Sequence, residues 1–342
     1  QRNLGGKPAV CQRREAHNRR PERRIPSPFP SFPTMPIRIG KAGKANALNE
    51  LGRRLDDEGD QDGALEAYAQ AGAVLPNWSA PWYNIGLIHK YRGDWAASLQ
   101  ANARAVQCDP RNEGAIWNLG IAATALGDWD AARSAWRQYG IKVPDGEGPV
   151  DLFIGLTPIR VHGDEASEVV WADRIDPARA ILRNVPTPDS GHRYGDLVLH
   201  DGAANGYRLR GGREVPVFDA LELIAPSDYS TYEVMVEDAT KEDIEALVRR
   251  FEAADASAEN WTTSMQILCR ACSEGRPYGE GRHNHGEGEE PGTLGPWRIG
   301  IAARQEEAAR RILDEWRDAI ATTSPKAALL DFRCVLVAIA RS

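Results

Sequence analysis

SAPWYNIGLIHKYRGDWAASLQANARAVQCDPRN, residues 79–112, is followed without a gap by EGAIWNLGIAATALGDWDAARSAWRQYGIKVPDG, residues 113–146. The two stretches align without a gap, and their apolar and small residues recur in phase. A third copy begins at Ala45, so that the spacing is 34 residues both times. Self-similarity at a period of this length predicts stacked supersecondary units, each of which buries its apolar face against its neighbours.

The residues that recur in phase have local physical roles. Gly at the eighth position has no Cβ and allows two helices to approach closely. Gly at the fifteenth position ends the first helix, and the Asp that follows caps the second. Pro at the thirty-second position ends the second helix. These positions hold Gly52, Gly86 and Gly120; Gly59, Gly93 and Gly127; Asp60, Asp94 and Asp128; and Pro76, Pro110 and Pro144.

This pattern resembles the tetratricopeptide repeat family over residues 45–146, about 30% of the chain. The resemblance implies three helical hairpins that form a scaffold for a protein or peptide partner. The sequence departs from the family where Leu55, His89 and Ala123 replace the aromatic residue of position eleven, and where Asn102 replaces that of position twenty-four. These departures affect local packing but leave the expected fold unchanged.

The resemblance also implies which side chains line the concave face. Asn84 and Asn118 are one repeat apart, and an Asn amide offers a donor and an acceptor to an extended peptide backbone. The alternative is that they are solvated surface residues. Tyr83, Leu87, Trp117 and Ile121 would form an apolar floor, which either binds a partner or is buried by the second half of this chain.

After residue 149 the pattern changes to short apolar runs separated by pairs such as Asp201-Gly202. Residues 150–226 are therefore expected to form an antiparallel sheet or barrel. Its expected strands are 152–156, 159–162, 168–171, 180–185, 196–200, 206–209 and 215–218.

The pattern of residues 227–320 predicts two strands, at 231–237 and 298–302. It also predicts three helices, at 241–254, 261–268 and 305–320. Two strand–helix units in one sheet would give an α+β segment as in ferredoxin-like domains. Residues 321–342 are expected to be a tail. The fold class is thus multidomain: an all-α tetratricopeptide repeat solenoid of three helical hairpins over residues 35–149, followed by an α+β domain with a strand-rich first part.

Cys269, Cys272, His283 and His285 have the spacing C-x2-C-x10-H-x-H. Two thiolates and two imidazoles form the ligand set of a structural Zn2+ site. A redox-active dithiol is a second interpretation, and buried cysteines beside solvated histidines are a third. The strand-rich segment also holds histidines and aspartates of catalytic type, namely His162, His192, His200, Asp196 and Asp201, and the run Ser190-Gly-His-Arg. No nucleophile-elbow pattern accompanies them, and scattered polar residues at turns are the favoured interpretation.

Composition narrows the class of partner. Residues 1–34 contain eight Lys or Arg and two Glu, whereas the whole chain has a net charge of −7. The acidic remainder argues against specific nucleic-acid binding. We expect residues 1–34 to be a disordered basic Pro-rich arm or an extension upstream of a start at Met35, since they lack apolar periodicity.

No apolar run is long enough to cross a bilayer, so that no membrane span is expected. The five cysteines are unevenly spread, which favours a reducing cytoplasm. Together these observations predict a cytoplasmic adaptor that binds a protein or peptide segment. The alternative is an enzyme or ligand sensor with its activity in residues 150–320 and with the repeats used for recruitment.

Overall fold

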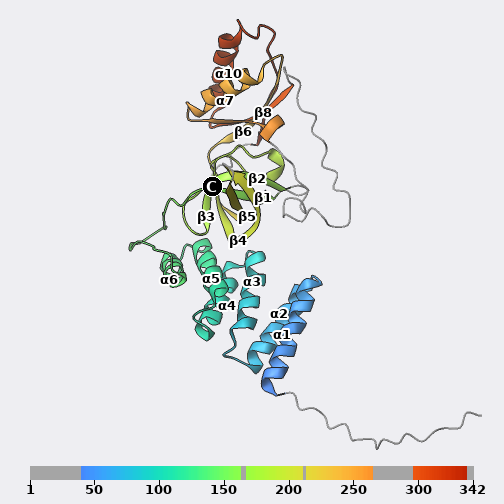
Figure 1. Ribbon diagram of the computed structural model, residues 1–342, viewed down its shortest axis with the longest axis vertical. Helices are drawn as coiled ribbons and strands as arrows, with labels where there is room; N and C mark the ends of the chain where they lie inside the picture. Colours follow the sequence, from blue (N-terminus) through green and yellow to red (C-terminus); the bar gives the residue numbers. More distant parts are fainter. Residues whose placement is uncertain (1–39, 163–166, 211–212, 265–295, 337–342) are drawn as a thin grey trace, which may run out of the picture. The chain divides into compact units, whose positions relative to one another are not determined.

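The structure is a computed structural model that describes residues 40–162, 167–210, 213–264 and 296–336 (Figure 1). Six helices come first and form three antiparallel hairpins, as the sequence pattern predicts. Their bounds are α1 Lys41–Asp57, α2 Gln61–Val74, α3 Ser79–Tyr91, α4 Trp95–Cys108, α5 Glu113–Ala125 and α6 Trp129–Tyr139.

The hairpin turns follow from the recurring Gly-Asp pair. Gly59, Gly93 and Gly127 have φ of 86°, 70° and 70°, a left-handed conformation that ends the first helix of each hairpin. The Asp after each Gly then accepts a backbone N–H from the first turn of α2, α4 or α6, and thereby caps that helix. The local sequence thus specifies both ends of every turn.

Close packing inside each hairpin depends on the Gly at the eighth position. A Cβ at Gly120 would lie 2.5 Å from the Trp136 ring, and one at Gly86 would lie 2.3 Å from Asn102 Nδ2. Asn102, which replaces an aromatic residue, is fully buried and donates from Nδ2 to the Ser98 carbonyl at 2.9 Å. A polar side chain therefore fills this position without an unpaired donor.

A closed five-stranded barrel follows the repeats. Its strands are β1 Gly155–His162, β2 Ser167–Arg174, β3 Arg179–Leu182, β4 Leu197–Arg210 and β5 Arg213–Ala225. Successive strands pair antiparallel, and β1 closes the barrel by a parallel pairing with β5 at Ile159 and Phe218. Inward-facing Ile159, Val161, Leu182 and Val198 belong to its apolar core.

Two expectations about the barrel strands were wrong. We expected a turn at Asp201-Gly202 between two strands, but residues 197–210 form the single strand β4. Its pairing with β5 shifts between His200 and Ala204, so that three residues bulge out where only Asp219 lies opposite. Likewise the runs 152–156 and 159–162 contribute to one strand, β1, which starts at Gly155.

The last described part is a four-stranded sheet in the order β7-β8-β6-β9 with all neighbours antiparallel. With α7 and α10 it has the chain order β-α-β-β-α-β, which confirms the ferredoxin-like expectation. Trp316, Phe251 and Ile299 pack between helices and sheet. The elements are β6 Ser230–Glu237, α7 Lys241–Glu252, β7 Ser257–Asn260, α8 Trp261–Ser264, β8 Trp297–Ala303, α10 Glu306–Ile320 and β9 Ala328–Leu336.

The barrel covers the end of the third repeat. Ile121 and Trp136 of the repeats belong to one buried cluster with Val150, Ala178 and Leu199. The guanidinium of Arg179 lies 4.8 Å from the centre of the Trp129 ring, and the Trp95 indole donates to Glu222. Since an exposed terminal repeat would leave apolar surface in water, the barrel takes the place of a capping helix.

Candidate functional site

The repeats and the bulge of β4 together enclose a cavity of about 400 Å³. We call it the groove pocket. Its lining includes Tyr83, Leu87, Trp117 and Asn118, which were expected on the concave face, and the bulge residues 201–203 of β4. The full lining is Tyr83, Leu87, Lys90, Tyr91, Glu113, Gly114, Trp117, Asn118, Tyr139, Asp201, Gly202 and Ala203.

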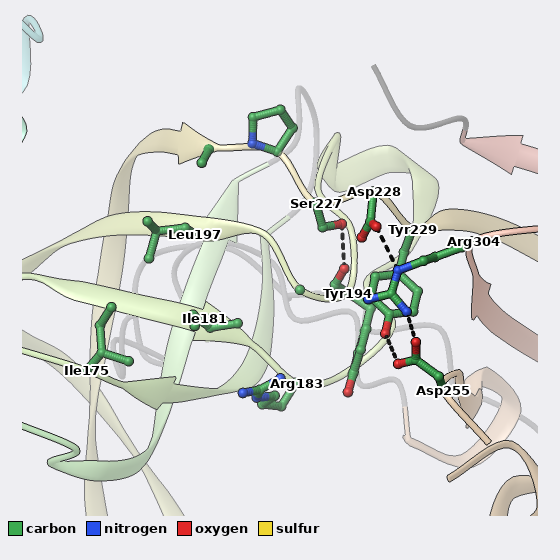
Figure 2. A pocket seen from close by; sticks show the side chains of 13 residues that line it. Ile175, Ile181, Arg183, Tyr194, Leu197, Ser227, Asp228, Tyr229, Asp255 and Arg304 are labelled. Carbon is green, nitrogen blue, oxygen red and sulfur yellow. Dashed lines mark hydrogen bonds and ion pairs between the residues drawn. The ribbon is translucent and has the colours of Figure 1, made fainter. Parts of the chain in front are cut away.

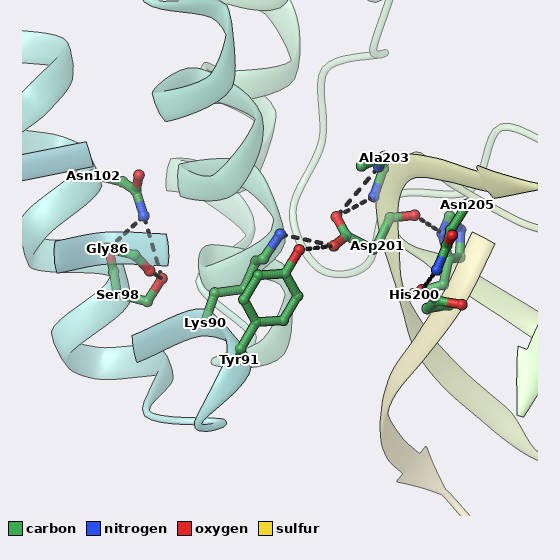
Figure 3. A network of polar contacts seen from close by, with 11 residues as sticks. Gly86, Lys90, Tyr91, Ser98, Asn102, His200, Asp201, Ala203 and Asn205 are labelled. Carbon is green, nitrogen blue, oxygen red and sulfur yellow. Dashed lines mark hydrogen bonds and ion pairs between the residues drawn. The ribbon is translucent and has the colours of Figure 1, made fainter. Parts of the chain in front are cut away.

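The bulge is fixed to α3 by a buried ion pair. Lys90 Nζ lies 2.8 Å from Asp201 Oδ2, and the Tyr91 hydroxyl donates to the same oxygen at 3.1 Å (Figure 3). The side chains of Lys90 and Asp201 are only 3% and 6% exposed. The other carboxylate oxygen, Oδ1, accepts the Gly202 amide at 2.7 Å. Both charges are therefore removed from water and compensated within the chain.

Trp117 packs directly on the bulge. A Cβ at Gly202 would lie 1.6 Å from Trp117 Nε1, so that only glycine leaves room for the indole at this point. Trp117 also contacts the Tyr139 ring edge-on, with 4.7 Å between the centroids. The indole consequently forms both a wall of the groove pocket and a contact between repeats and barrel.

The predicted apolar floor is divided between these two roles. Ile121 is fully buried in the cluster shared with the barrel and offers no accessible surface. Tyr83, Leu87 and Trp117 are partly exposed and line the groove pocket. Burial by the second half of the chain thus applies to Ile121, whereas Tyr83, Leu87 and Trp117 remain accessible and their partner-binding role stays a prediction.

The two predicted asparagines also differ. Asn84 donates from Nδ2 to Asn49 Oδ1 at 3.2 Å, which links α3 to α1. Asn118 is 4% exposed, lines the groove pocket and makes no side-chain hydrogen bond with any residue in the described ranges. The amide atoms of Asn118 are not among the buried polar atoms that lack a partner, so they remain accessible and can both donate and accept. The amide of Asn118 is therefore available to a ligand in the pocket.

The phenols of the groove pocket are held in the protonated form. Burial raises the pKa of Tyr83, and the negative charge of Asp201 raises it further. The pKa of Tyr91 is raised for the same two reasons, and also because its hydroxyl donates to Asp201. Both hydroxyls consequently remain neutral donors at any physiological pH.

His200 supports the bulge from inside the barrel. It is fully buried, and its Nδ1 lies 2.7 Å from the Asp201 carbonyl oxygen, which can only accept a hydrogen bond. Nδ1 therefore carries the proton. Burial lowers the pKa of His200 to about 3, and the nearby Arg174 charge contributes. The imidazole is neutral and acts as a positioning group for the bulge.

A second, larger cavity of about 1020 Å³ lies where the barrel meets the sheet of β6 to β9 (Figure 2). The charged side chains of its lining are all paired. Arg304 donates to Asp228 at 2.7 Å and pairs with Asp255, the Tyr229 hydroxyl donates to Asp255 at 2.8 Å, and Arg183 donates to Asp173 outside the lining at 2.7 Å. The Arg304 pairs join two parts of the chain through largely exposed side chains.

Some sequence hypotheses are not addressed by these contacts. Cys269, Cys272, His283 and His285 lie outside the described residues, so the zinc hypothesis stays a prediction. Within the described ranges, no group of three His, Cys, Asp or Glu side chains is arranged to hold a metal ion. His192 and Asp196 come within 3.6 Å of each other, but Ser190 donates to the Thr187 carbonyl.

No described helix is long and apolar enough to cross a membrane.

Three solved structures are similar to the helical segment. They are the second and the first tetratricopeptide repeat domains of Spaghetti (RPAP3), each bound to the HSP90 peptide SRMEEVD, and the corresponding domain of Arabidopsis OM64. Their identities are 18%, 20% and 17%, and their TM-scores are 0.27, 0.28 and 0.28. Each match covers 29% of this chain, and 85%, 78% and 83% of the other chain.

Residues 41–139 have the tetratricopeptide repeat fold. This assignment depends on the three hairpins and on their 34-residue spacing. No family model matches the chain, and no curated protein matches it. The barrel and the ferredoxin-like part are therefore described by their topology alone.

Sequence reasoning missed the contribution of the barrel to the groove pocket. Asp201-Gly202 was interpreted as a turn, although an Asp-Gly pair inside an apolar run also fits a bulge. Glu113 and Tyr139 were missed because they are close to the pocket only in the folded chain. The pairing of Lys90 with Asp201 could not be foreseen from local sequence, because the two residues lie far apart in the chain.

Proposed function

We propose that this chain is a protein-interaction adaptor whose groove pocket binds an extended segment of a partner protein. The observation that carries the proposal is Asn118, a mostly buried residue whose amide borders the cavity and has no hydrogen-bond partner among the described residues. Backbone N–H and C=O groups of an extended peptide are the natural complement of such an amide, because it both donates and accepts.

The surroundings of Asn118 support this proposal. Tyr83, Leu87 and Trp117 provide accessible apolar side chains in a concave site, and ligand sites are typically lined in this way. The site is built on α3 and α5, and the buried Lys90–Asp201 pair holds its third wall. A rigid wall reduces the conformational entropy that is lost when a partner binds. A short peptide segment therefore suffices for recognition.

Replacement of Asn118 by Ala should weaken peptide binding by about tenfold, because the hydrogen bonds to the bound backbone are lost. Stability should change little, since no described residue loses a hydrogen-bond partner. The measurement is panning of a random linear peptide display library against the full chain, followed by titration of enriched peptides by calorimetry. Asn77→Ala, which removes an exposed asparagine between α2 and α3, is the matched control and should bind as the wild type does.

Two outcomes would overturn the adaptor proposal. One is that no peptide is enriched over an unrelated protein. The other is that enriched peptides bind Asn118→Ala with wild-type affinity, since these peptides then do not use the groove pocket. The alternative function is an enzyme or ligand sensor with its activity in residues 150–320. Its candidate site is the larger cavity of Figure 2, where the lining residues Arg304 and Asp228 already pair with each other.

We also propose a structural Zn2+ held by Cys269, Cys272, His283 and His285. The purified chain should contain one equivalent of zinc by metal analysis, and chelation should lower its melting temperature, because a structural site contributes binding energy to folding. Cys269→Ser with Cys272→Ser should abolish the metal, whereas Cys108→Ser, a matched change on α4, should retain it. A metal-free wild-type protein purified in zinc-supplemented buffer would exclude the site.

A further inference from the structure

We propose that the groove pocket receives the cationic side chain of an arginine or lysine in the bound segment. This inference rests on the proposed function and specifies the chemistry of the partner. It follows from two properties of the pocket wall, its aromatic faces and its net negative charge.

Aromatic rings form much of the wall. Tyr83 and Tyr91 come from α3, Trp117 comes from α5 and Tyr139 comes from α6. Tyr91 and Tyr139 are 59% and 40% exposed, so that both rings leave apolar area in contact with water. The face of an aromatic ring carries partial negative charge, so that a cation within about 6 Å of the centroid is attracted. The Lys90 ammonium already lies 4.3 Å from the centroid of the Tyr91 ring, so the rings that favour a cationic guest are those of Tyr83, Trp117 and Tyr139, from three helices.

The charged residues of the pocket wall also favour a cationic guest. Lys90 and Asp201 neutralise each other in their buried pair. Glu113, the remaining charged residue of the lining, is exposed and forms no ion pair within the described ranges. The wall therefore has a net charge of about −1, and the bound Lys90 ammonium is not available to an anionic guest.

The size of the cavity and the position of Asn118 indicate that the cation belongs to a peptide. About 400 Å³ holds one long side chain with part of its backbone, but no folded element. Asn118 borders the same cavity and can bond the peptide groups that flank the side chain. A free amine would leave this amide unsatisfied, whereas an arginine or lysine within a chain would use both features.

The experiment uses two minimal probes, N-acetyl-arginine N-methylamide and its neutral isostere N-acetyl-citrulline N-methylamide. Each is titrated into the full chain while the Trp117 indole N–H signal is followed by NMR, assigned by its loss in Trp117→Phe. The arginine probe should shift this signal in a saturable manner, and the citrulline probe should bind about three- to thirtyfold more weakly.

Variants of residues in the pocket wall separate the contribution of the charge from that of the aromatic ring. Glu113→Gln removes the uncompensated charge and should weaken the arginine probe by about threefold or more, without affecting the citrulline probe. Glu66→Gln, the same change at an exposed residue of α2, should leave both probes unaffected. Tyr139→Leu should weaken the arginine probe, whereas Tyr139→Phe keeps the ring and should retain it.

Equal binding of the two probes, or no saturable shift with either, would overturn the cationic specificity. The adaptor proposal fails by a different result. If panning yields peptides that depend on Asn118 but lack a basic residue, the groove binds partners and only the assignment of a cationic guest is wrong.

Discussion

Asp201→Asn should lower the free energy of unfolding of the full chain by about 3–5 kcal/mol, because it leaves the Lys90 ammonium buried without a counter-charge. The pair lies at 2.8 Å with both side chains almost completely buried, so that water cannot replace the lost carboxylate. The Tyr91 hydroxyl does not compensate, since it donates a hydrogen bond and carries no negative charge. The measurement is urea unfolding monitored by tryptophan fluorescence.

Two controls identify the buried charge as the cause. Asp145→Asn breaks the pair between Arg137 and Asp145, whose side chains are 43% and 99% exposed, and should cost less than about 1 kcal/mol. Lys90→Met combined with Asp201→Asn removes both charges and should recover most of the loss. An Asp201→Asn protein as stable as the wild type would contradict the arrangement in which the bulge is fixed to α3.

Acidification should destabilise the wild type more steeply than His200→Asn. The folded-state pKa of His200 is lowered from 6.5 to about 3, mainly by burial. As the pH falls below 6.5, the unfolded chain takes up a proton on His200 that the folded chain does not. Its contribution to stability is therefore present above pH 6.5 and is lost as the pH falls to about 3, at a slope that approaches about 1.4 kcal/mol per pH unit.

Asn is a suitable replacement because its side-chain amide can donate to the Asp201 carbonyl as Nδ1 does. The measurement is the free energy of unfolding at several values between pH 7 and pH 4, for both proteins at one ionic strength. The variant should have a lower stability at pH 7 and a flatter decline. Parallel curves for wild type and variant would show that His200 takes up its proton equally in the folded and unfolded chains, contrary to its burial here.

The repeats could be predicted from sequence because their signals are local. Gly93 and Asp94 fix a turn by conformation and capping, and this logic is independent of the rest of the chain. The two strands that we did not predict, β7 and β9, are the edges of their sheet. Asp331 has φ of 51° where the pairing of β9 with β6 shifts, which interrupts the alternation that marks a strand.

The candidate site could be predicted only in part for a related reason. The positions of Tyr83, Trp117 and Asn118 follow from the resemblance to tetratricopeptide repeats, which implies which helix residues line the concave face. The close approach of Gly202 to Trp117 depends on the register of β4 against β5. Gly202 and Trp117 themselves are far apart in the sequence. Sequence alone therefore indicated the surface but not the wall that encloses it.

The most direct test of partner binding is to follow the side-chain amide signals of Asn118 by NMR, assigned by their loss in Asn118→Ala, while a panned peptide is added to the full chain. We predict that these signals shift with the same dissociation constant as calorimetry reports, and that their exchange with solvent slows. Amide signals that stay unchanged while the peptide saturates the protein would contradict the account.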